Sequence, residues 1–119
     1  MKLYTGMMLL LLANGAYALD CQNAMTQRDM NQCAYLDFQK EDKVLNQLYQ
    51  RHRATLSNER KTQLKEAQQA WLRFRDLSCD YEADFYVGGS IAPMVKSACL
   101  IAQTKNRIVD LNHYLDNPQ

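Results

Sequence analysis

Three carboxylates are the residues in this sequence whose spacing could support acid–base chemistry. Asp80 and Asp84 are four residues apart, so on a helix they share one face, and Glu82 lies between them in the chain. Paired carboxylates can act as general acid and base. No serine elbow, glycine-rich phosphate loop or HExxH string accompanies them. We therefore favour the competing interpretation, a solvated acidic face.

The two histidines also lack catalytic surroundings. His52 falls on the apolar face of an expected helix, where a core or boundary histidine is a simpler interpretation than a general base. His113 lies near the C-terminus of another expected helix, where it complements the helix dipole. We therefore predict no catalytic residues, no enzymatic activity and no cofactor.

Four cysteines predict two disulfide bonds. They are Cys21, Cys33, Cys79 and Cys99. An even number of cysteines is typical of disulfides in a small exported domain. There is no CxxC pair and both histidines are distant in sequence, so we predict no zinc or other metal site. Three pairings are possible; the near-symmetric placement of Cys79 and Cys99 about Gly88-Gly89 favours Cys79–Cys99 with Cys21–Cys33.

Residues 1–18 have the features of a cleaved signal peptide. Lys2 supplies a charged start, an apolar run follows, and Ala16-Tyr17-Ala18 is a small-x-small cleavage site. The run is far shorter than the ~20 residues that span a bilayer, so we expect no membrane anchor after cleavage. Asp20 stands directly before Cys21, where a lipoprotein signal needs a small residue, so lipidation is not expected.

Residues 19–119 fit one small domain, which we expect in the periplasm or outside the cell. Removal of the signal takes only Lys2 from the 14 basic residues, which leaves 13 against 13 acidic residues. A neutral net charge argues against binding to nucleic acid or anionic membranes, since both need a basic excess.

Helical periodicity and scarce chain breakers predict an all-α domain, a small antiparallel three-helix bundle stapled by two disulfides. We expect the first helix to begin at Thr26, where Thr26 and Asp29 resemble a capping box. Its apolar face extends to Leu56.

The second helix is expected over about residues 59–86, with Ser57 or Asn58 as its cap. Gly88-Gly89-Ser90 then interrupts the helical pattern. We expect Ser90 to cap the third helix and Pro93 to fit its first turn, where the missing N–H costs nothing.

The inward stripe of the second helix contains two polar residues, Gln68 and Arg75, on either side of Trp71. The whole stripe is Leu64, Ala67, Gln68, Trp71, Phe74, Arg75 and Ser78. If the first two helices form a hairpin that turns near Asn58, Tyr49 faces Gln68 and Asp42 faces Arg75. We hypothesise that Asp42–Arg75 is a partly buried ion pair that fixes the register; the alternative is two solvated surface charges.

The segment after Cys79 is the best candidate for a binding surface. Its acidic, aromatic and loop residues are Asp80, Tyr81, Glu82, Asp84, Phe85, Tyr86, Gly88, Gly89 and Ser90. A loop held by a Cys79–Cys99 bridge, with acidic and aromatic flanks, suits insertion into a basic or sugar-binding cleft. The alternative is that Tyr81 and Phe85 pack between helices and the glycines only form the turn.

The chain also resembles the LprI-like family of bacterial envelope proteins. The most specific parts of the match are D-x-x-LN-x-x-Y at 42–49 and Q-x-AW-x-x-x-RD at 68–76, together with the cysteine spacing. Gly88-Gly89-Ser90 and Arg107 with Leu111 also match. The resemblance identifies residues 19–119 as an LprI-like helical domain. This sequence lacks the lipobox of the lipid-anchored family members, since Asp20 precedes Cys21.

The resemblance implies a secreted or periplasmic binding protein that inhibits lysozyme-type muramidases, since some members are described as inhibitors of animal-type lysozyme. The alternative is a structural or interaction module of the cell envelope, with another envelope protein as its partner and no lysozyme affinity.

Overall fold

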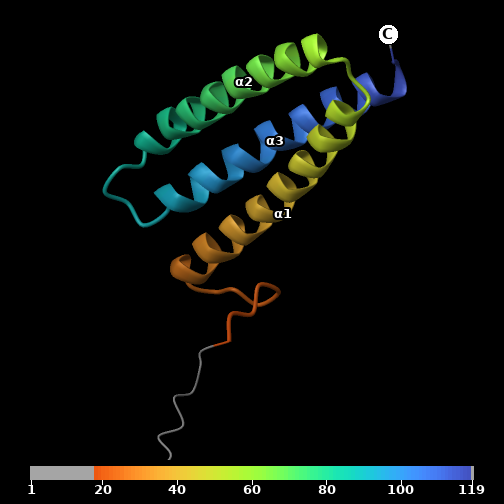
Figure 1. Ribbon diagram of the computed structural model, residues 1–119. Coiled ribbons are helices and arrows are strands. Elements are labelled where there is room, and N and C mark those ends of the chain that lie inside the picture. The colour runs from red at the N-terminus through yellow and green to blue at the C-terminus, as the bar shows by residue number, and fades with distance from the viewer. Residues whose placement is uncertain (1–17, 119) are drawn as a thin grey trace, which may run out of the picture.

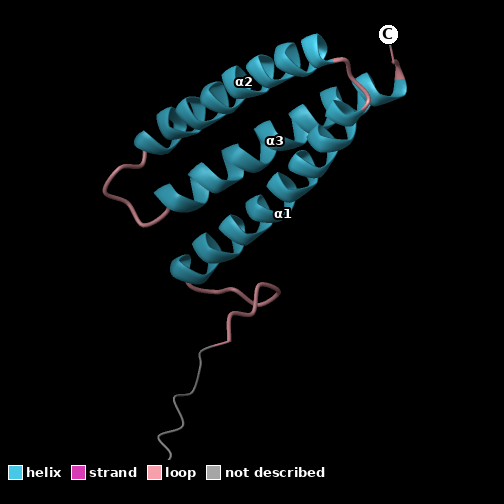
Figure 2. Ribbon diagram, viewed as in Figure 1, coloured by secondary structure: helices cyan, strands magenta, loops and turns pink. Residues whose placement is uncertain are grey.

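A computed structural model describes residues 18–118, and the expected signal sequence up to residue 17 lies outside the described residues. Three helices make up this part of the chain: α1 (Gln27–Ala54), α2 (Asn58–Asp84) and α3 (Ala92–Asp116). Figure 2 shows loops and no strands between them. The prediction of an all-α bundle with two disulfides is confirmed.

The third helix lies between the other two (Figure 1). In this view the chain follows α1, returns along α2 and runs back along α3 in the direction of α1. Both α1 and α2 pack along α3, whereas their own backbones seldom come close. The first two helices were predicted to pair directly as a hairpin, and the central position of α3 was not predicted.

Local side-chain chemistry explains the start of two helices. The hydroxyls of Thr26 and Ser57 accept hydrogen bonds from the backbone amides three residues ahead, at 3.1 and 3.3 Å, so both predicted caps are confirmed. Ser90 was the predicted cap of the third helix, and this is wrong. Ile91 stands at that position without a side-chain cap, while Pro93 lies in the first turn as predicted.

The apolar core forms two clusters at different levels of the bundle. The larger consists of Leu45, Leu48, Leu64 and Leu111; the smaller consists of Cys79, Cys99 and Leu100, with Phe38 packed against it. Complete burial of a leucine side chain stabilises a fold by about 1.5–3 kcal/mol. The two clusters therefore hold all three helices together. None of these helices is apolar enough over a sufficient length to cross a membrane.

Arg75 forms a buried polar centre in the structure. Its side chain is 8% exposed, and its Nη1 donates to Asp42 Oδ1 of α1 at 3.1 Å. Nε donates to Asp76 Oδ1 at 2.9 Å, and Nη1 also reaches Thr104 Oγ1 of α3 at 3.4 Å. The guanidinium also lies 5.3 Å from the centre of the Trp71 ring. One arginine thus contacts all three helices.

A second arginine provides the partner of Gln68. Arg107 of α3 donates from Nε to Gln68 Oε1 at 2.9 Å, and both side chains are buried. Its guanidinium lies 5.9 Å from the centre of the Trp71 ring. The hairpin register predicted that Tyr49 of the first helix faces Gln68, whereas the hydrogen bond to Gln68 comes from α3. The expectation that this amide needs a partner is confirmed.

Phe74 was predicted to face inward, and this is wrong: it is 59% exposed. The buried residues of α2 form a single narrow seam against α3, made of Leu64, Gln68, Arg75, Cys79 and Ala83. Phe74 is rotated by about 100° from its neighbour Arg75, which occupies the seam.

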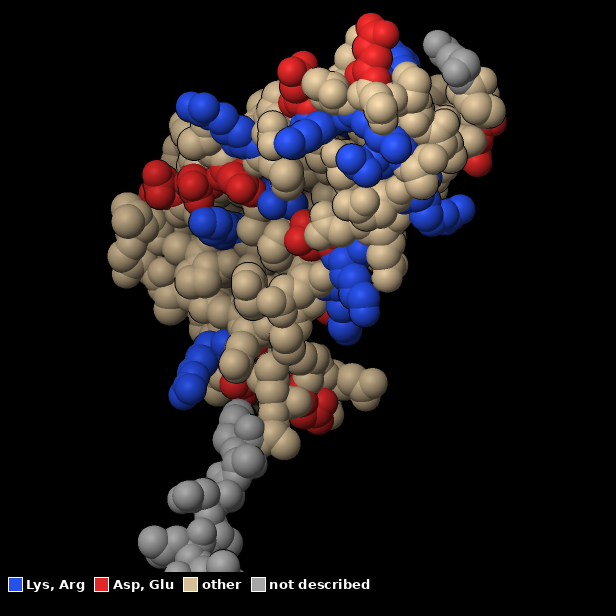
Figure 3. Space-filling model, in the orientation of Figure 1, with Lys and Arg blue, Asp and Glu red and all other residues tan. Residues whose placement is uncertain are grey.

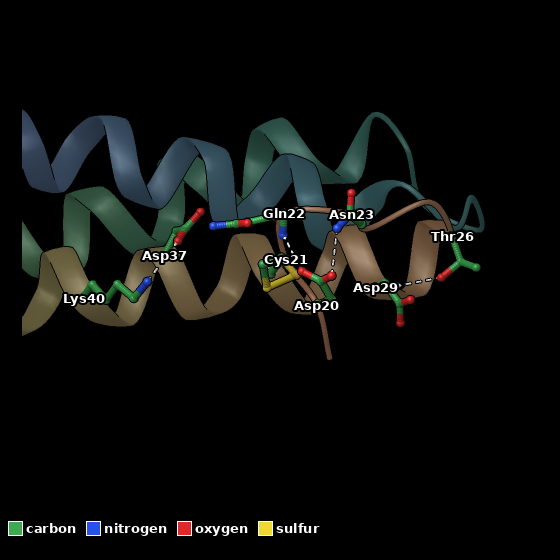
Figure 4. The surroundings of a disulfide bond; sticks show 9 residues. Asp20, Cys21, Gln22, Asn23, Thr26, Asp29, Asp37 and Lys40 are labelled. Atoms are coloured by element: carbon green, nitrogen blue, oxygen red, sulfur yellow. Dashed lines mark hydrogen bonds and ion pairs between the residues drawn. A yellow bond between two sulfur atoms is a disulfide. The ribbon is translucent and has the colours of Figure 1, made fainter. Parts of the chain in front are cut away.

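The first disulfide fixes the segment before α1. Cys21 is bonded to Cys33, so this segment folds back against the first turns of the helix (Figure 4). The Asp20 carboxylate accepts hydrogen bonds from the Gln22 amide at 3.0 Å and Asn23 Nδ2 at 2.8 Å. These bonds, chiefly the one from Asn23, lower the pKa of Asp20.

Candidate functional site

The candidate site is the α2–α3 loop, residues 85–91, which protrudes from the end of the bundle where α1 begins (Figure 1). The second disulfide, Cys79–Cys99, ties α2 to α3 behind this loop. Both cysteines are buried. The two pairings favoured by the sequence are therefore confirmed, and both bridges lie at the loop end of the molecule.

Tight backbone turns give the loop a defined shape. The amides of Tyr86 and Val87 donate to the carbonyls three residues earlier, at 2.9 and 3.2 Å, and Gly89 N donates to Tyr86 O at 2.9 Å. Gly88 has φ +82°, a left-handed conformation that L side chains seldom adopt. These turns end α2 at Asp84, two residues before the predicted end at Tyr86.

The first helix also holds the loop, through a contact that was not predicted from the sequence. Asn31 Nδ2 donates to the Ser90 carbonyl at 2.8 Å, and Asn31 Oδ1 accepts from Gln27 Nε2 at 2.7 Å. Gln27 Nε2 also lies 3.6 Å from Met94 Sδ of α3. In the sequence, only the spacing of Gln27 and Asn31, two amide side chains four residues apart on one helix face, pointed to this contact. The loop is therefore anchored by α1 as well as by the disulfide.

The three acidic residues before the loop do not form one patch. Asp80 Oδ1 lies 2.6 Å from Lys96 Nζ of α3, so this charge is already paired. Glu82 is two residues from Asp80 and from Asp84, a rotation of about 200°, which places it across the helix from both. Within residues 18–118 no ion pair is recorded for Glu82 or Asp84, and both are exposed.

Large apolar side chains dominate the surface around the loop. Tyr81, Phe85 and Val87 are 68%, 72% and 81% exposed, and Tyr86 is about half exposed. The Tyr81 and Phe85 rings meet edge to face with centroids 5.2 Å apart. The alternative that these two rings pack between helices is therefore wrong. Figure 3 shows a broad surface without charged side chains at this end, with charges of both signs above it.

A cavity at the opposite end of the bundle contains both histidines. Its volume is about 760 Å³, and His52, Arg60, Arg107 and His113 supply its basic lining. Among residues 18–118, His52 Nδ1 is buried without a hydrogen-bond partner, and no carboxylate of these residues lines the cavity. His52 therefore lacks the group that would orient it as a general base. In residues 18–118 no three His, Cys, Asp or Glu side chains are placed to hold a metal.

The comparisons with known proteins support the family resemblance of the sequence. The family model described as "Lysozyme inhibitor LprI" matches residues 20–111. The chain is 31% identical over 113 residues to an uncharacterized protein of Rhizobium meliloti (strain 1021), an alignment that covers 84% of this chain and 81% of the relative. No solved structure matches. The chain therefore belongs to the LprI lysozyme inhibitor family.

Proposed function

We propose that this protein is a secreted or periplasmic binding protein that inhibits a lysozyme-type muramidase through its α2–α3 loop. Membership of a family described as lysozyme inhibitors supports the partner class. The observation that carries the choice of loop is its double anchorage, by the Cys79–Cys99 bridge and by the Asn31–Ser90 hydrogen bond.

The α2–α3 loop is held rigidly and carries exposed apolar side chains, and both features favour binding. A loop that is ordered before binding loses little conformational entropy when it enters a cleft. Phe85, Tyr86 and Val87 project exposed apolar groups. Aromatic residues such as Phe85 and Tyr86 are enriched at protein interfaces, and tyrosine is among the residues that supply most of the binding energy there. Asp84 and Glu82, which form no ion pair within residues 18–118, add negative charge that favours a basic partner.

The test is a titration of the oxidised mature chain into a cell-wall clearing assay with several lysozyme-type muramidases, with calorimetry alongside. We expect saturable inhibition at sub-micromolar concentration. Val87→Asp should weaken inhibition at least tenfold because it places a charge at the centre of the apolar contact. Circular dichroism should show unchanged helicity, since Val87 lies outside the helices.

A charge-reversal pair tests the acidic contribution separately. Asp84→Lys should weaken inhibition, whereas Glu66→Lys should not. The two positions are 18 residues apart, which is five full helical turns, so they occupy the same face of α2 about 27 Å apart. Equal effects of both changes would indicate a general charge effect and not a contact at the loop.

Absence of both heat and inhibition with every muramidase would contradict the proposal. In that case the second function, an interaction module of the envelope, would be favoured. A specific partner recovered from periplasm by the wild-type chain, and lost with Val87→Asp, would then assign the loop to that partner.

A further inference from the structure

The solvent-facing side of α2 carries an apolar stripe, of which the proposed muramidase contact includes only Phe85. We call the outer stripe the four residues Phe74, Leu77, Tyr81 and Phe85, which are 59%, 59%, 68% and 72% exposed. Their spacing of three, four and four residues places them along one face of the helix. Two small exposed residues, Ala67 and Ala70, continue the same face toward the N-terminus of α2.

The outer stripe is a large apolar patch for a small domain. With about 200 Å² for a fully exposed large side chain, the four exposed fractions leave roughly 500 Å² of apolar surface, at the upper end of what a typical monomer shows. The stripe is rotated by about 140° from the seam that packs on α3, so no other helix of residues 18–118 covers it.

We propose that a second copy of this chain covers the outer stripe, with the two α2 helices antiparallel about a two-fold axis. In this arrangement Phe74 of each copy lies opposite Leu77 of the other. The small side chain of Ala70 then lies opposite the large ring of Tyr81, which lets the two helices approach closely. Two such stripes would bury roughly 1,000 Å², which meets the lower bound for a specific interface.

Charges beside the outer stripe fit this register. Arg73 and Asp80 are seven residues apart on one flank, and both are exposed. In a two-fold dimer this flank of one α2 helix faces the same flank of the other. Arg73 of each copy therefore lies opposite Asp80 of the other copy, which gives two symmetry-related contacts. Lys96 pairs with only one carboxylate oxygen of Asp80. The other oxygen can accept a hydrogen bond from Arg73 of the second copy.

The neighbouring register is opposed by like charges. A shift that placed Phe74 opposite Ala70 would bring Glu66 opposite Asp80, and Arg73 opposite Arg73. Like charges at such positions disfavour pairing. The outer stripe is therefore self-complementary in one antiparallel register and not in the next, which favours a second copy over a partner of unrelated charge.

Sedimentation velocity over a hundredfold range of concentration tests the proposal on the oxidised mature chain. We expect a concentration-dependent dimer. Leu77→Asp should raise the dissociation constant at least tenfold, because each dimer then buries two new carboxylates. The matched control is Val109→Asp, which adds the same charge at a 66% exposed valine of α3 and should leave the dimer unchanged.

A charge exchange tests the register. Arg73→Asp and Asp80→Arg should each abolish the dimer alone, while a mixture of the two variants should form a heterodimer, since both inter-copy contacts become attractive. Circular dichroism checks that each variant folds without the Asp80–Lys96 pair. A mixture that stays monomeric while the wild type dimerises would overturn the proposed arrangement.

A wild-type chain that is monomeric at every concentration would also overturn the proposal. If Leu77→Asp then abolished inhibition in the clearing assay, the outer stripe would belong to the muramidase contact. Dimerisation with no inhibition would leave the dimer in place and contradict only the proposed function.

Discussion

At the scale of single residues, Trp71 is close to two buried arginines that connect the helices. The guanidinium groups of Arg75 and Arg107 lie 5.3 and 5.9 Å from the centre of its ring. Both arginines also have hydrogen-bond acceptors. This geometry explains why glutamine, tryptophan and arginine recur at three- and four-residue steps in α2: each polar group needs a partner on α1 or α3.

The ion pair between Arg75 and Asp42 should be strongly coupled. A double-mutant cycle with Arg75→Ala and Asp42→Ala should give a coupling free energy above about 1 kcal/mol, measured by urea denaturation, because Arg75 is buried. The control pair is Lys40–Asp37, which is well exposed at 3.7 Å and should give almost none. Equal coupling in the two cycles would show that Asp42–Arg75 does not fix the helix register.

The half-buried imidazole of His52 should make stability depend on pH. Burial, and then the positive charge of Arg60, lower its pKa below the ordinary 6.5. The unfolded chain therefore binds the proton more readily than the folded chain, so stability is complete above the ordinary pKa and is lost as the pH falls through the lowered one.

The melting temperature followed from about pH 7.5 to 5 measures this effect of His52. His52→Gln should flatten the decline, whereas His113→Gln should retain it because His52 is still present. A variant at position 52 that declines like the wild type would assign the acid sensitivity to other groups.

At the scale of elements, the sequence predicts helix starts well where the chemistry is local. Thr26 and Ser57 cap their helices because the chain enters each of them in an extended conformation, which lets a hydroxyl reach the amides ahead. Ser90 does not cap α3, because the chain enters this helix through Ile91 in a helical conformation, with φ −83° and ψ −17°. The backbone conformation of this turn depends on contacts from other helices, such as the hydrogen bond from Asn31 of α1 to Ser90. Residue spacing in the sequence does not reveal such contacts.

The two apolar faces of α2 explain the error at Phe74. The seam against α3 and the outer stripe both repeat at three- and four-residue steps, so periodicity alone cannot say which face is buried. The same ambiguity concealed the exposure of Tyr81 and Phe85. The surface of the candidate segment therefore differs from the expected one: Asp80 is paired with Lys96, and most of the exposed surface is aromatic or aliphatic.

The turn between α2 and α3 should be sensitive to substitution at Gly88. Gly88→Ala should lower the free energy of unfolding by about 1–2 kcal/mol, because an L side chain is strained at φ +82°. Gly88→Asn should cost less, since asparagine tolerates this region.

Urea denaturation measures these costs, and Gly89→Ala is the comparison. The added Cβ there would lie 3.1 Å from Tyr86 O without a positive φ. A loss at Gly89 as large as at Gly88 would indicate crowding in the turn and not backbone strain.

At the scale of the whole molecule, α3 is the element on which the other two helices are built. It supplies Thr104 and Arg107 to the buried polar residues and Leu100 and Leu111 to the two core clusters. The sequence predicts three helices from their periodicity and breaks. It does not predict which helix is central, because an apolar stripe specifies that a face is buried and not which neighbour buries it.

The two disulfides should differ in their contribution to stability. Closing the Cys79–Cys99 loop, with a sequence separation of 20, contributes on the order of 3 kcal/mol, and the Cys21–Cys33 loop contributes a similar amount by chain entropy. Cys79 and Cys99 are also part of the smaller core cluster, whereas Cys21 is exposed.

Replacing Cys79 and Cys99 together by serine should therefore destabilise the oxidised chain more than the same change at Cys21 and Cys33. Urea denaturation of the two double variants measures the difference. Equal losses would show that loop closure alone sets the contribution of each bridge.

Both covalent bridges lie at one end of the bundle, and the larger apolar cluster lies toward the other. Thermal fluctuations should therefore open the molecule unevenly, from the unbridged end inward. Backbone amides in the last turns of α1 and α3 should exchange with deuterium through local opening, while those of α3 beside Cys99 should exchange only when the whole chain unfolds. Proteases should accordingly attack the α1–α2 turn first and leave the loop that is proposed to bind the muramidase intact.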